Sequence, residues 1–406
     1  MRTSFNRQAT MVVAMVALLL LCACSSEPDA TGTPTKTPGA LQHSAATKPP
    51  PVMATSIPTV TPRTPSPTPE PEPTGTPQPE VIEGLIGPEV YDHDVNPLTG
   101  EVMTDPTVLD RRPVAVKFSN YPPQYVRPQA GLDKADLVFE HYAEGGVTRL
   151  TAIFYGQGTS QAGSIRSGRM IDLEIPAMYQ SAFAYSGASA GVREKIRYSD
   201  FYERVVSPDF GYGEPYFYRM PRDGVPFEHT LFADLYDIWA WLDSNDNNTR
   251  PELKGLAFSD MPPAGGVPVS SLLVGYLSAD CQVKWVYTPA TGRYLRWQGG
   301  AAHTELTSGA QLSAANVVIV GAHHKDTDIL EDHVAGGHYS VQIQIWGDGP
   351  ASLFRDGQRF EGRWQRTDRE DMLTFTDLDG NILPFKPGNT WFQMVPLGFD
   401  RLIVEP

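Results

Sequence analysis

The sequence predicts an α+β fold in two parts: a mixed α/β domain over residues 86–260 and a mostly antiparallel β domain over residues 261–406. In the first part, strand patterns are interspersed with helical stripes. A stretch rich in Pro and Gly at residues 259–266 marks the boundary. Beyond it, short strand patterns recur between turn signals, which is typical of a sheet, a sandwich or a partial barrel.

The first domain begins with strand patterns. Residues 113–119 alternate Val114, Val116 and Phe118 with smaller or polar residues, which predicts a half-buried strand. Two further strands are expected at 136–142 and 147–155, joined by a hairpin-like turn at residues 143–146. The remaining short elements are a helix at 170–180 interrupted by Pro176, a strand at 180–186 and a helix at 190–198.

The clearest helical pattern covers residues 230–245. Its apolar side chains fall on one stripe, and Thr230 is the expected N-cap. The second domain shows no comparable stripe. Its predicted strands are 267–277, 282–287, 294–297, 317–320, 341–346, 351–355, 372–376 and 391–395.

The N-terminus has the build of a secretory signal over residues 1–23. Arg2 and Arg7 precede a short apolar run, and the small residue Ala23 stands directly before Cys24. A Cys at this place resembles the lipobox of bacterial lipoproteins, and the resemblance implies that Cys24 is lipidated. An ordinary signal peptide or a signal anchor is the alternative. We therefore expect attachment to the extracytoplasmic face of the cell membrane through Cys24.

Residues 24–85 are dominated by Pro, Thr, Ser and Ala. Such a composition cannot bury enough apolar surface to fold, so it predicts a disordered tether. The tether would hold the folded part away from the membrane.

The chain is acidic, with 32 Lys and Arg against 47 Asp and Glu and a net charge of -15. General attraction to nucleic acid is therefore excluded, and an anionic ligand would need a local cluster of arginines. Apart from Cys24, processing leaves Cys281 as the remaining cysteine, so no internal disulfide is expected.

Several segments together resemble the YerB-like family of bacterial lipoproteins, a domain of unknown function with N- and C-terminal halves. The matching segments are 112–116, 127–132, 135–140, 144–150, 165–169, 286–287, 294–296, 315–320 and 387–396. The resemblance implies an envelope lipoprotein but no settled activity. One departure lies at residues 185–191, where a His-Gly-Gly-Ser-Pro-like turn is expected and the His and Pro are missing.

Four residues form the main candidate site. Glu144 and Arg149 flank Gly145-Gly146, while Arg166 and Arg169 lie in a turn rich in Gly and Ser. Arg grips phosphate or carboxylate through paired hydrogen bonds, so these residues suit an anionic ligand. A structural ion-pair network is the simpler interpretation.

A second candidate is Ser189, within the string Gly187-Ala188-Ser189-Ala190-Gly191. The string fits the Gly-x-Ser-x-Gly pattern of serine hydrolases, with His229 as the nearest partner. Repeated β-α units are missing upstream, however, and small residues in a strand–helix turn explain the string without catalysis.

A third candidate is a short segment rich in imidazole and carboxylate groups, which suit zinc or a similar cation. No known ligand spacing appears, so a solvated loop is the favoured interpretation and neither a metal nor a cofactor is predicted. The residues are His323, His324, Asp326, Asp328, His333 and His338. Separately, Trp297 and Trp364 are candidates for exposed rings that stack on sugars.

The leading hypothesis is a non-catalytic lipoprotein that binds a cell-wall glycan, another envelope component or a protein partner between its two halves. The first alternative is an extracytoplasmic hydrolase or transferase acting on an anionic wall polymer, with Glu144 as general acid or base. The second alternative is a metal-binding or sensing lipoprotein.

Overall fold

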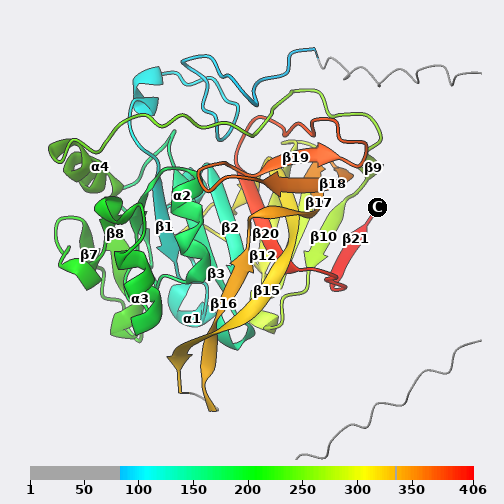
Figure 1. Ribbon diagram of the computed structural model, residues 1–406. Helices are drawn as coiled ribbons and strands as arrows, with labels where there is room; N and C mark the ends of the chain where they lie inside the picture. Colours follow the sequence, from blue (N-terminus) through cyan, green and yellow to red (C-terminus); the bar gives the residue numbers. More distant parts are fainter. Residues whose placement is uncertain (1–82, 334–335) are drawn as a thin grey trace, which may run out of the picture. The chain divides into compact units, whose positions relative to one another are not determined.

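The computed structural model describes residues 83–333 and 336–406. Within these residues the fold is mixed and mostly β, with short helices (Figure 1). Its centre is a twelve-stranded sheet in the order β19-β18-β17-β15-β20-β2-β3-β1-β5-β6, to which β16 and β9 are added. The strands are β1 (Val114–Phe118), β2 (Leu137–Tyr142), β3 (Thr148–Phe154), β5 (Ala182–Ala184), β6 (Val205–Val206), β9 (Val267–Pro268), β15 (Asn316–Asp332), β16 (His338–Gln344), β17 (Gly347–Arg355), β18 (Gln358–Arg366), β19 (Thr374–Asp377) and β20 (Thr390–Pro396).

Two smaller sheets complete the β structure of the described residues. The six-stranded sheet has the order β13-β12-β11-β10-β21, with β14 beside β12, and the three-stranded sheet has the order β4-β8-β7. Their strands are β4 (Ala162–Gly163), β7 (Phe217–Arg219), β8 (Leu231–Ala233), β10 (Ser271–Val274), β11 (Val283–Thr288), β12 (Arg293–Gln298), β13 (Ala301–Ala302), β14 (Ser313–Ala314) and β21 (Leu402–Glu405).

The helices are short. The α-helices are α1 (Pro123–Val126), α2 (Ile175–Met178), α3 (Ala190–Arg197) and α4 (Leu235–Ser244). The 3-10 helices are η1 (Pro106–Leu109), η2 (Leu132–Lys134), η3 (Glu144–Gly146), η4 (Met170–Leu173), η5 (Tyr202–Arg204), η6 (Pro208–Phe210), η7 (Phe227–His229) and η8 (Ala279–Cys281). Helix α4 starts later than predicted, because Asp234 rather than Thr230 accepts hydrogen bonds from its first turn. Residues 231–233 form strand β8 instead.

Strands from both predicted domains share the large sheet. Strand β20 pairs in parallel with β2 on one side and with β15 on the other. The boundary at residue 260 stays a prediction, but the segments on its two sides are joined by these hydrogen bonds.

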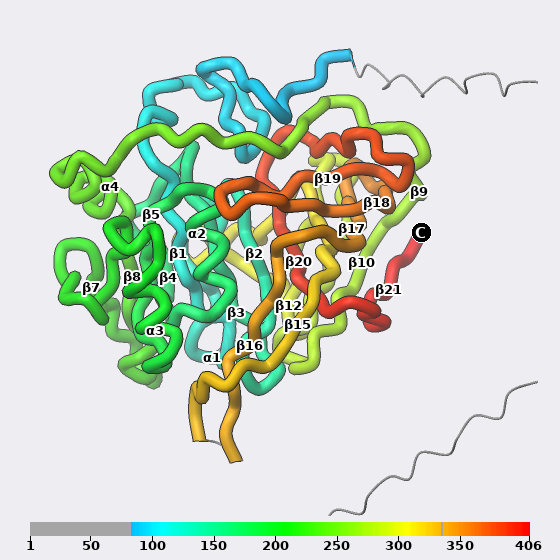
Figure 2. The backbone as a smooth tube through the Cα atoms, in the orientation of Figure 1, coloured from blue at the N-terminus to red at the C-terminus, as the bar shows by residue number. Residues whose placement is uncertain are grey.

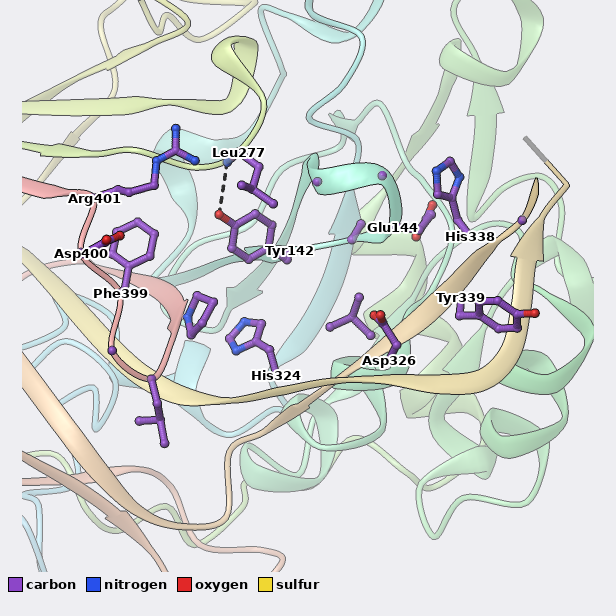
Figure 3. A pocket seen from close by; sticks show the side chains of 18 residues that line it. Tyr142, Glu144, Leu277, His324, Asp326, His338, Tyr339, Phe399, Asp400 and Arg401 are labelled. Atoms are coloured by element: carbon purple, nitrogen blue, oxygen red, sulfur yellow. Dashed lines mark hydrogen bonds between the residues drawn. The ribbon is translucent and has the colours of Figure 1, made fainter. Parts of the chain in front are cut away.

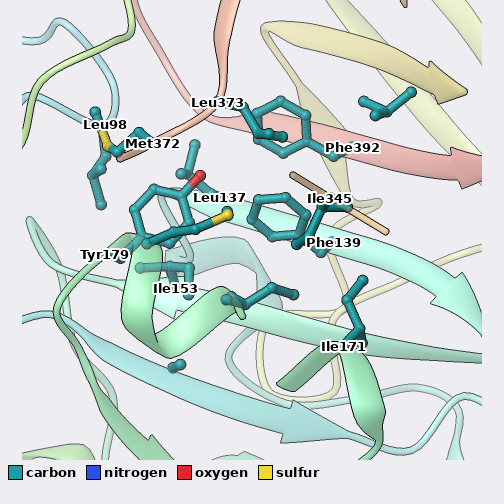
Figure 4. Close-up of a cluster of buried hydrophobic side chains, with 14 of the residues drawn as sticks. Leu98, Leu137, Phe139, Ile153, Ile171, Tyr179, Ile345, Met372, Leu373 and Phe392 are labelled. Carbon is teal, nitrogen blue, oxygen red and sulfur yellow. The ribbon is translucent and has the colours of Figure 1, made fainter. Parts of the chain in front are cut away.

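Both faces of the large sheet are covered. One face packs around Phe139, Ile153 and Phe392 (Figure 4), and the other around Val116, Val138 and Trp391. The prediction that residues 113–119 are half-buried is therefore wrong, since all five residues of β1 are buried. A strand covered on both faces needs partners for every polar side chain it carries.

The charged segment after residue 322 is not a loop as predicted. Strand β15 continues through it to Asp332 and pairs with β16 from His323 onward. Figure 2 shows this hairpin extending beyond the sheet. Sequence patterns also missed β18 and β21, and Trp364 on β18 is buried, at 1% exposure, rather than exposed.

An ion pair buried on both sides joins the large sheet to the six-stranded sheet. The carboxylate of Glu140 on β2 lies 2.7 Å from a guanidinium nitrogen of Arg296 on β12, and neither side chain is exposed. Glu140 also accepts hydrogen bonds from Asn120, Thr148 and Gln298, at 3.1, 2.8 and 3.0 Å respectively. A buried carboxylate with this many donors is fully compensated only while Arg296 is present.

Replacing Arg296 by Met should lower the free energy of unfolding by about 3–5 kcal/mol, because the charge of Glu140 then stays buried without its partner. The matched control is Lys284→Met on the neighbouring strand β11, whose pair with Glu405 is exposed. That change should cost less than about 1 kcal/mol. Urea unfolding measures both, and equal losses in the two variants would contradict the assignment.

Candidate functional site

The predicted site residues Glu144 and Arg169 form a bidentate ion pair. Arg169 Nε donates to Glu144 Oε2 at 2.6 Å, and Arg169 Nη2 donates to Glu144 Oε1. The turn η3 places Glu144 here, and it needs glycine because Gly145 and Gly146 have φ values of 70° and 74°. On the other side of Arg169, Glu331 of β15 lies 3.7 Å away. Arg169 is therefore held by carboxylates from both sides of residue 260.

Arg149 lies beside this pair without a carboxylate of its own. Its side chain is buried, with 6% exposure, and Arg149 Nη1 donates a hydrogen bond to the carbonyl of Thr148 at 3.3 Å. Among the described residues, its Nε has no hydrogen-bond partner. Burial, together with the nearby charges of Arg169 and Arg166, lowers the pKa of Arg149 to about 10, so the group stays charged at neutral pH.

Arg166 and His229 extend the cluster. Within the described residues, the side chain of Arg166 donates a hydrogen bond to the carbonyl of Glu228 at 3.5 Å and to no other group, and burial lowers its pKa. His229 stacks on Tyr125 at 5.5 Å between ring centres. Burial and the charges of Arg166 and Arg149 lower the pKa of His229 to about 4, so the ring is neutral at pH 7.

Unsatisfied polar atoms gather in this region. Arg222 donates a hydrogen bond to the carbonyl of Tyr125 at 2.7 Å, and its positive charge contributes to lowering the pKa of His229. In the described part of the chain, four nearby buried atoms lack a hydrogen-bond partner: Arg149 Nε, Arg222 Nε, His229 Nδ1 and Ser164 Oγ. Buried polar groups are nearly always paired, so these atoms indicate a place for a polar ligand or ordered water.

A buried polar network around Lys117 is connected to the arginine cluster through Asp172. Lys117 Nζ lies 2.7 Å from Asp172 and donates to Thr151 at 3.0 Å. Its third contact is His141 Nε2, at 2.6 Å. Burial lowers the pKa of Lys117 to about 8, against the opposing effect of Asp172. Because Asp172 also accepts from the backbone N–H of Arg169 at 2.7 Å, the network fixes the start of η4 and so the position of Arg169.

Two family models match the sequence. The N-terminal domain of DUF3048, a protein of unknown function, matches residues 98–248, and its C-terminal domain matches residues 273–392. The chain belongs to the DUF3048 family. The expected membership in the YerB-like lipoproteins is confirmed by this match and by the similar sequence and crystal structure described next.

One relative of this DUF3048 chain is a protein of Bacillus subtilis (strain 168) named "Putative lipoprotein YerB". It is 30% identical over 302 residues, which cover 74% of this chain and 86% of the relative. The crystal structure of the YerB protein from Bacillus subtilis is similar with a TM-score of 0.65 and 27% identity, covering 77% of this chain and 99% of that one.

Ser189 has the partners of a helix cap. Its hydroxyl accepts from the backbone of Val192 at 3.4 Å, at the start of α3, and donates to Glu331 at 3.0 Å. Through Glu331 it is connected to Arg169. His229, its predicted imidazole partner, lies instead beside Arg166 and Tyr125.

The six candidate metal ligands are spread along the β15–β16 hairpin. His324, Asp326 and His338 line one pocket, Asp326 and Asp328 line a second one, and His323 and His333 are exposed. Within residues 83–333 and 336–406, no group of three or more His, Cys, Asp or Glu side chains is arranged to hold a metal ion. His338 is hydrogen-bonded to Asp332 at 2.9 Å.

Cys24 lies outside the described residues. No helix in the part of the chain that the structure describes has the length and apolar character needed to cross a membrane. Among residues that the sequence did not single out, Glu331, Arg222 and the Lys117 network contribute to the cluster. Of these residues, Lys117 is the one whose sequence context could have drawn attention to it, because it is a charged residue within a strongly apolar strand pattern.

The ion pair of Glu144 should make stability depend on pH. Burial opposes the charge of Glu144, but Arg169 outweighs it and holds the pKa at about 2, below the ordinary 4.5. The pair therefore stabilises the protein fully above about pH 4.5, and this stabilisation is lost as the pH falls toward 2.

We expect Glu144→Gln to lower the free energy of unfolding by about 3 kcal/mol at pH 7, and the difference from wild type to shrink on acidification. Urea unfolding at pH 7, 4 and 3 measures this difference. Glu252→Gln, at an exposed position, is the control. A difference that stays constant over this range would show that Glu144 is not paired as described.

Proposed function

We propose that the protein is a lipid-anchored lipoprotein on the extracytoplasmic face of the cell membrane, and that it binds an anionic group of an envelope component or partner through Arg149 and Arg166. The anchoring is supported by the leader that ends at Cys24 and by the name of the relative from Bacillus subtilis. The binding role is supported by the charge balance of the site.

The buried, unpaired guanidinium of Arg149 carries this proposal. Leaving a buried cation without a counter-charge costs stability, and proteins usually pair or remove such groups. Arg169 shows how this chain pairs an arginine when the role is structural, because two carboxylates contact it. Arg149 and Arg166 form no ion pair among the described residues. A bound phosphate or carboxylate would supply the missing charge.

The unsatisfied atoms next to the two arginines support the same conclusion. Arg149 Nε and His229 Nδ1 are buried and unpaired, at 6% and 3% exposure of their residues. An anion at this place would accept hydrogen bonds from the guanidinium groups. Such charge-assisted hydrogen bonds are stronger than those between neutral groups. Glu144 remains ionised, so within the site it orients Arg169 rather than donating a proton.

Arg149→Met should separate binding from folding. Inorganic phosphate, succinate and a glycerol phosphate polymer are titrated into the full-length protein in detergent by isothermal titration calorimetry. At least one anion should bind the wild type, and both Arg149→Met and Arg166→Gln should weaken it about tenfold or more. Because an unpaired buried charge is removed, Arg149→Met should keep or raise the free energy of unfolding.

The control is Arg363→Gln, which removes an exposed arginine paired with Asp348. It should leave anion affinity unchanged. Absence of binding by all three anions at about 10 mM, or strong destabilisation by Arg149→Met, would instead assign Arg149 to a structural network.

Membrane attachment is tested by Cys24→Ser. We expect the wild type in the membrane fraction after cell lysis and the variant in the soluble or secreted fraction, because a single lipidated residue would supply the anchor. Labelling with an alkyne fatty acid measures the lipidation, and fractionation of the labelled cells measures the membrane attachment. Membrane retention of an unlabelled Cys24→Ser protein would favour a signal anchor.

A further inference from the structure

A pocket of about 520 Å³ is lined on one side by η3. It is bounded by the end of β2, by the β15–β16 hairpin and by the turn at residues 396–401 that follows β20 (Figure 3). This turn is closed by a hydrogen bond from Phe399 N to Pro396 O at 3.1 Å. The volume is in the range that holds a small organic molecule or one or two side chains.

The walls are mainly apolar and stay exposed. Leu277, Tyr339 and Leu397 have 65%, 46% and 40% of their surface exposed, and all three line the pocket. Tyr142 and Phe399 add aromatic rings to the lining (Figure 3). Exposed apolar side chains around one concavity indicate a surface that binds an apolar group.

The inner polar groups are neutral. The ring of His324 meets that of Tyr142 edge to face at 5.9 Å, and its Nδ1 is bonded to the carbonyl of Ala322 at 3.0 Å. Burial lowers the pKa of His324, and burial raises that of Tyr142. Neither group therefore places a charge in the pocket at pH 7.

Charge enters through carboxylates. Asp326 points into the pocket from β15, and Asp400 lies on the rim (Figure 3). Neither has an ion-pair partner in the described part of the chain. Glu144 also lines the pocket, but Arg169 neutralises it. Arg401 is the opposing charge on the rim, and His338 is bonded to Asp332.

We propose that this pocket binds an apolar organic cation, in which an aromatic or branched aliphatic body is attached to a protonated amine. The body would pack against Leu277, Tyr142 and Phe399, while the amine would contact Asp326. This site is separate from the anion site of Arg149 and Arg166 and does not depend on it. A free amine and the side chains of a peptide offer the same chemistry.

The test uses ligands that differ in charge. Tryptamine, indolepropionate and the dipeptide acetyl-tryptophanyl-lysinamide are titrated into the full-length protein in detergent by isothermal titration calorimetry. Tryptamine and indolepropionate share the indole ring and carry opposite charges. We expect tryptamine or the dipeptide to bind about tenfold more tightly than indolepropionate, and the tighter of the two identifies the source as a free amine or a peptide.

Variants locate the binding. Asp326→Asn should weaken the amine about fivefold, whereas Asp328→Asn, on the same strand but outside this pocket, should not. Leu277→Ser should weaken it to a similar extent, and since Leu277 is largely exposed, its replacement leaves the core intact. Arg401→Gln should strengthen the amine about twofold by removing the opposing charge.

Arg149→Met distinguishes the two sites, because it should weaken anion binding about tenfold or more and leave amine binding unchanged. Equal affinities for tryptamine and indolepropionate would overturn the proposal. So would amine binding that neither Asp326→Asn nor Leu277→Ser weakens, or no binding of either amine at about 10 mM, the weakest affinity that a ligand of this size should show in a fitting pocket.

Discussion

Strand β20 is the element on which the rest of the structure depends. It is hydrogen-bonded in parallel to β2 on one side and to β15 on the other, and thereby joins segments that lie far apart in the sequence. A strand with neighbours on both sides and packed layers above and below must be apolar, and Trp391, Phe392 and Met394 are buried. Water is excluded from both faces of this sheet, so every polar side chain beside β20 must find its partner within the protein.

The polar residues of β2 and its following turn meet that requirement in three different ways. Glu140 turns to one face and is compensated by Arg296, while His141 turns to the other face and is joined to Lys117. Past the end of the strand, Glu144 pairs with Arg169. Among the described residues beside them, Arg149 on the neighbouring strand β3 and Arg166 have no carboxylate partner. The candidate site is therefore the place where a consistent rule of the core is broken, which is typical of functional sites.

Much of the N-terminal part could be predicted, because β1, β2, β3 and α3 follow local periodicity. The arginine cluster could also be found, since three arginines near glycines stand out in an acidic chain. The contribution of Glu331 could not be predicted, because a β hairpin of charged residues brings it to Arg169, which lies 162 positions earlier in the chain (331 minus 169). The burial of Trp364 and the full burial of β1 depend likewise on layers contributed by distant segments, which local patterns do not contain.

Cys281 has the surroundings of a protected thiol. Its thiol is buried and accepts a hydrogen bond from the backbone of Thr148 at 3.3 Å, next to the candidate site. It is a free thiol, and the described residues contain no disulfide. Because the sulfur is buried against Thr148 of β3, a reagent needs local opening of the fold to reach it. The thiol is thus a built-in reporter of local opening beside Arg149, readable through its rate of alkylation.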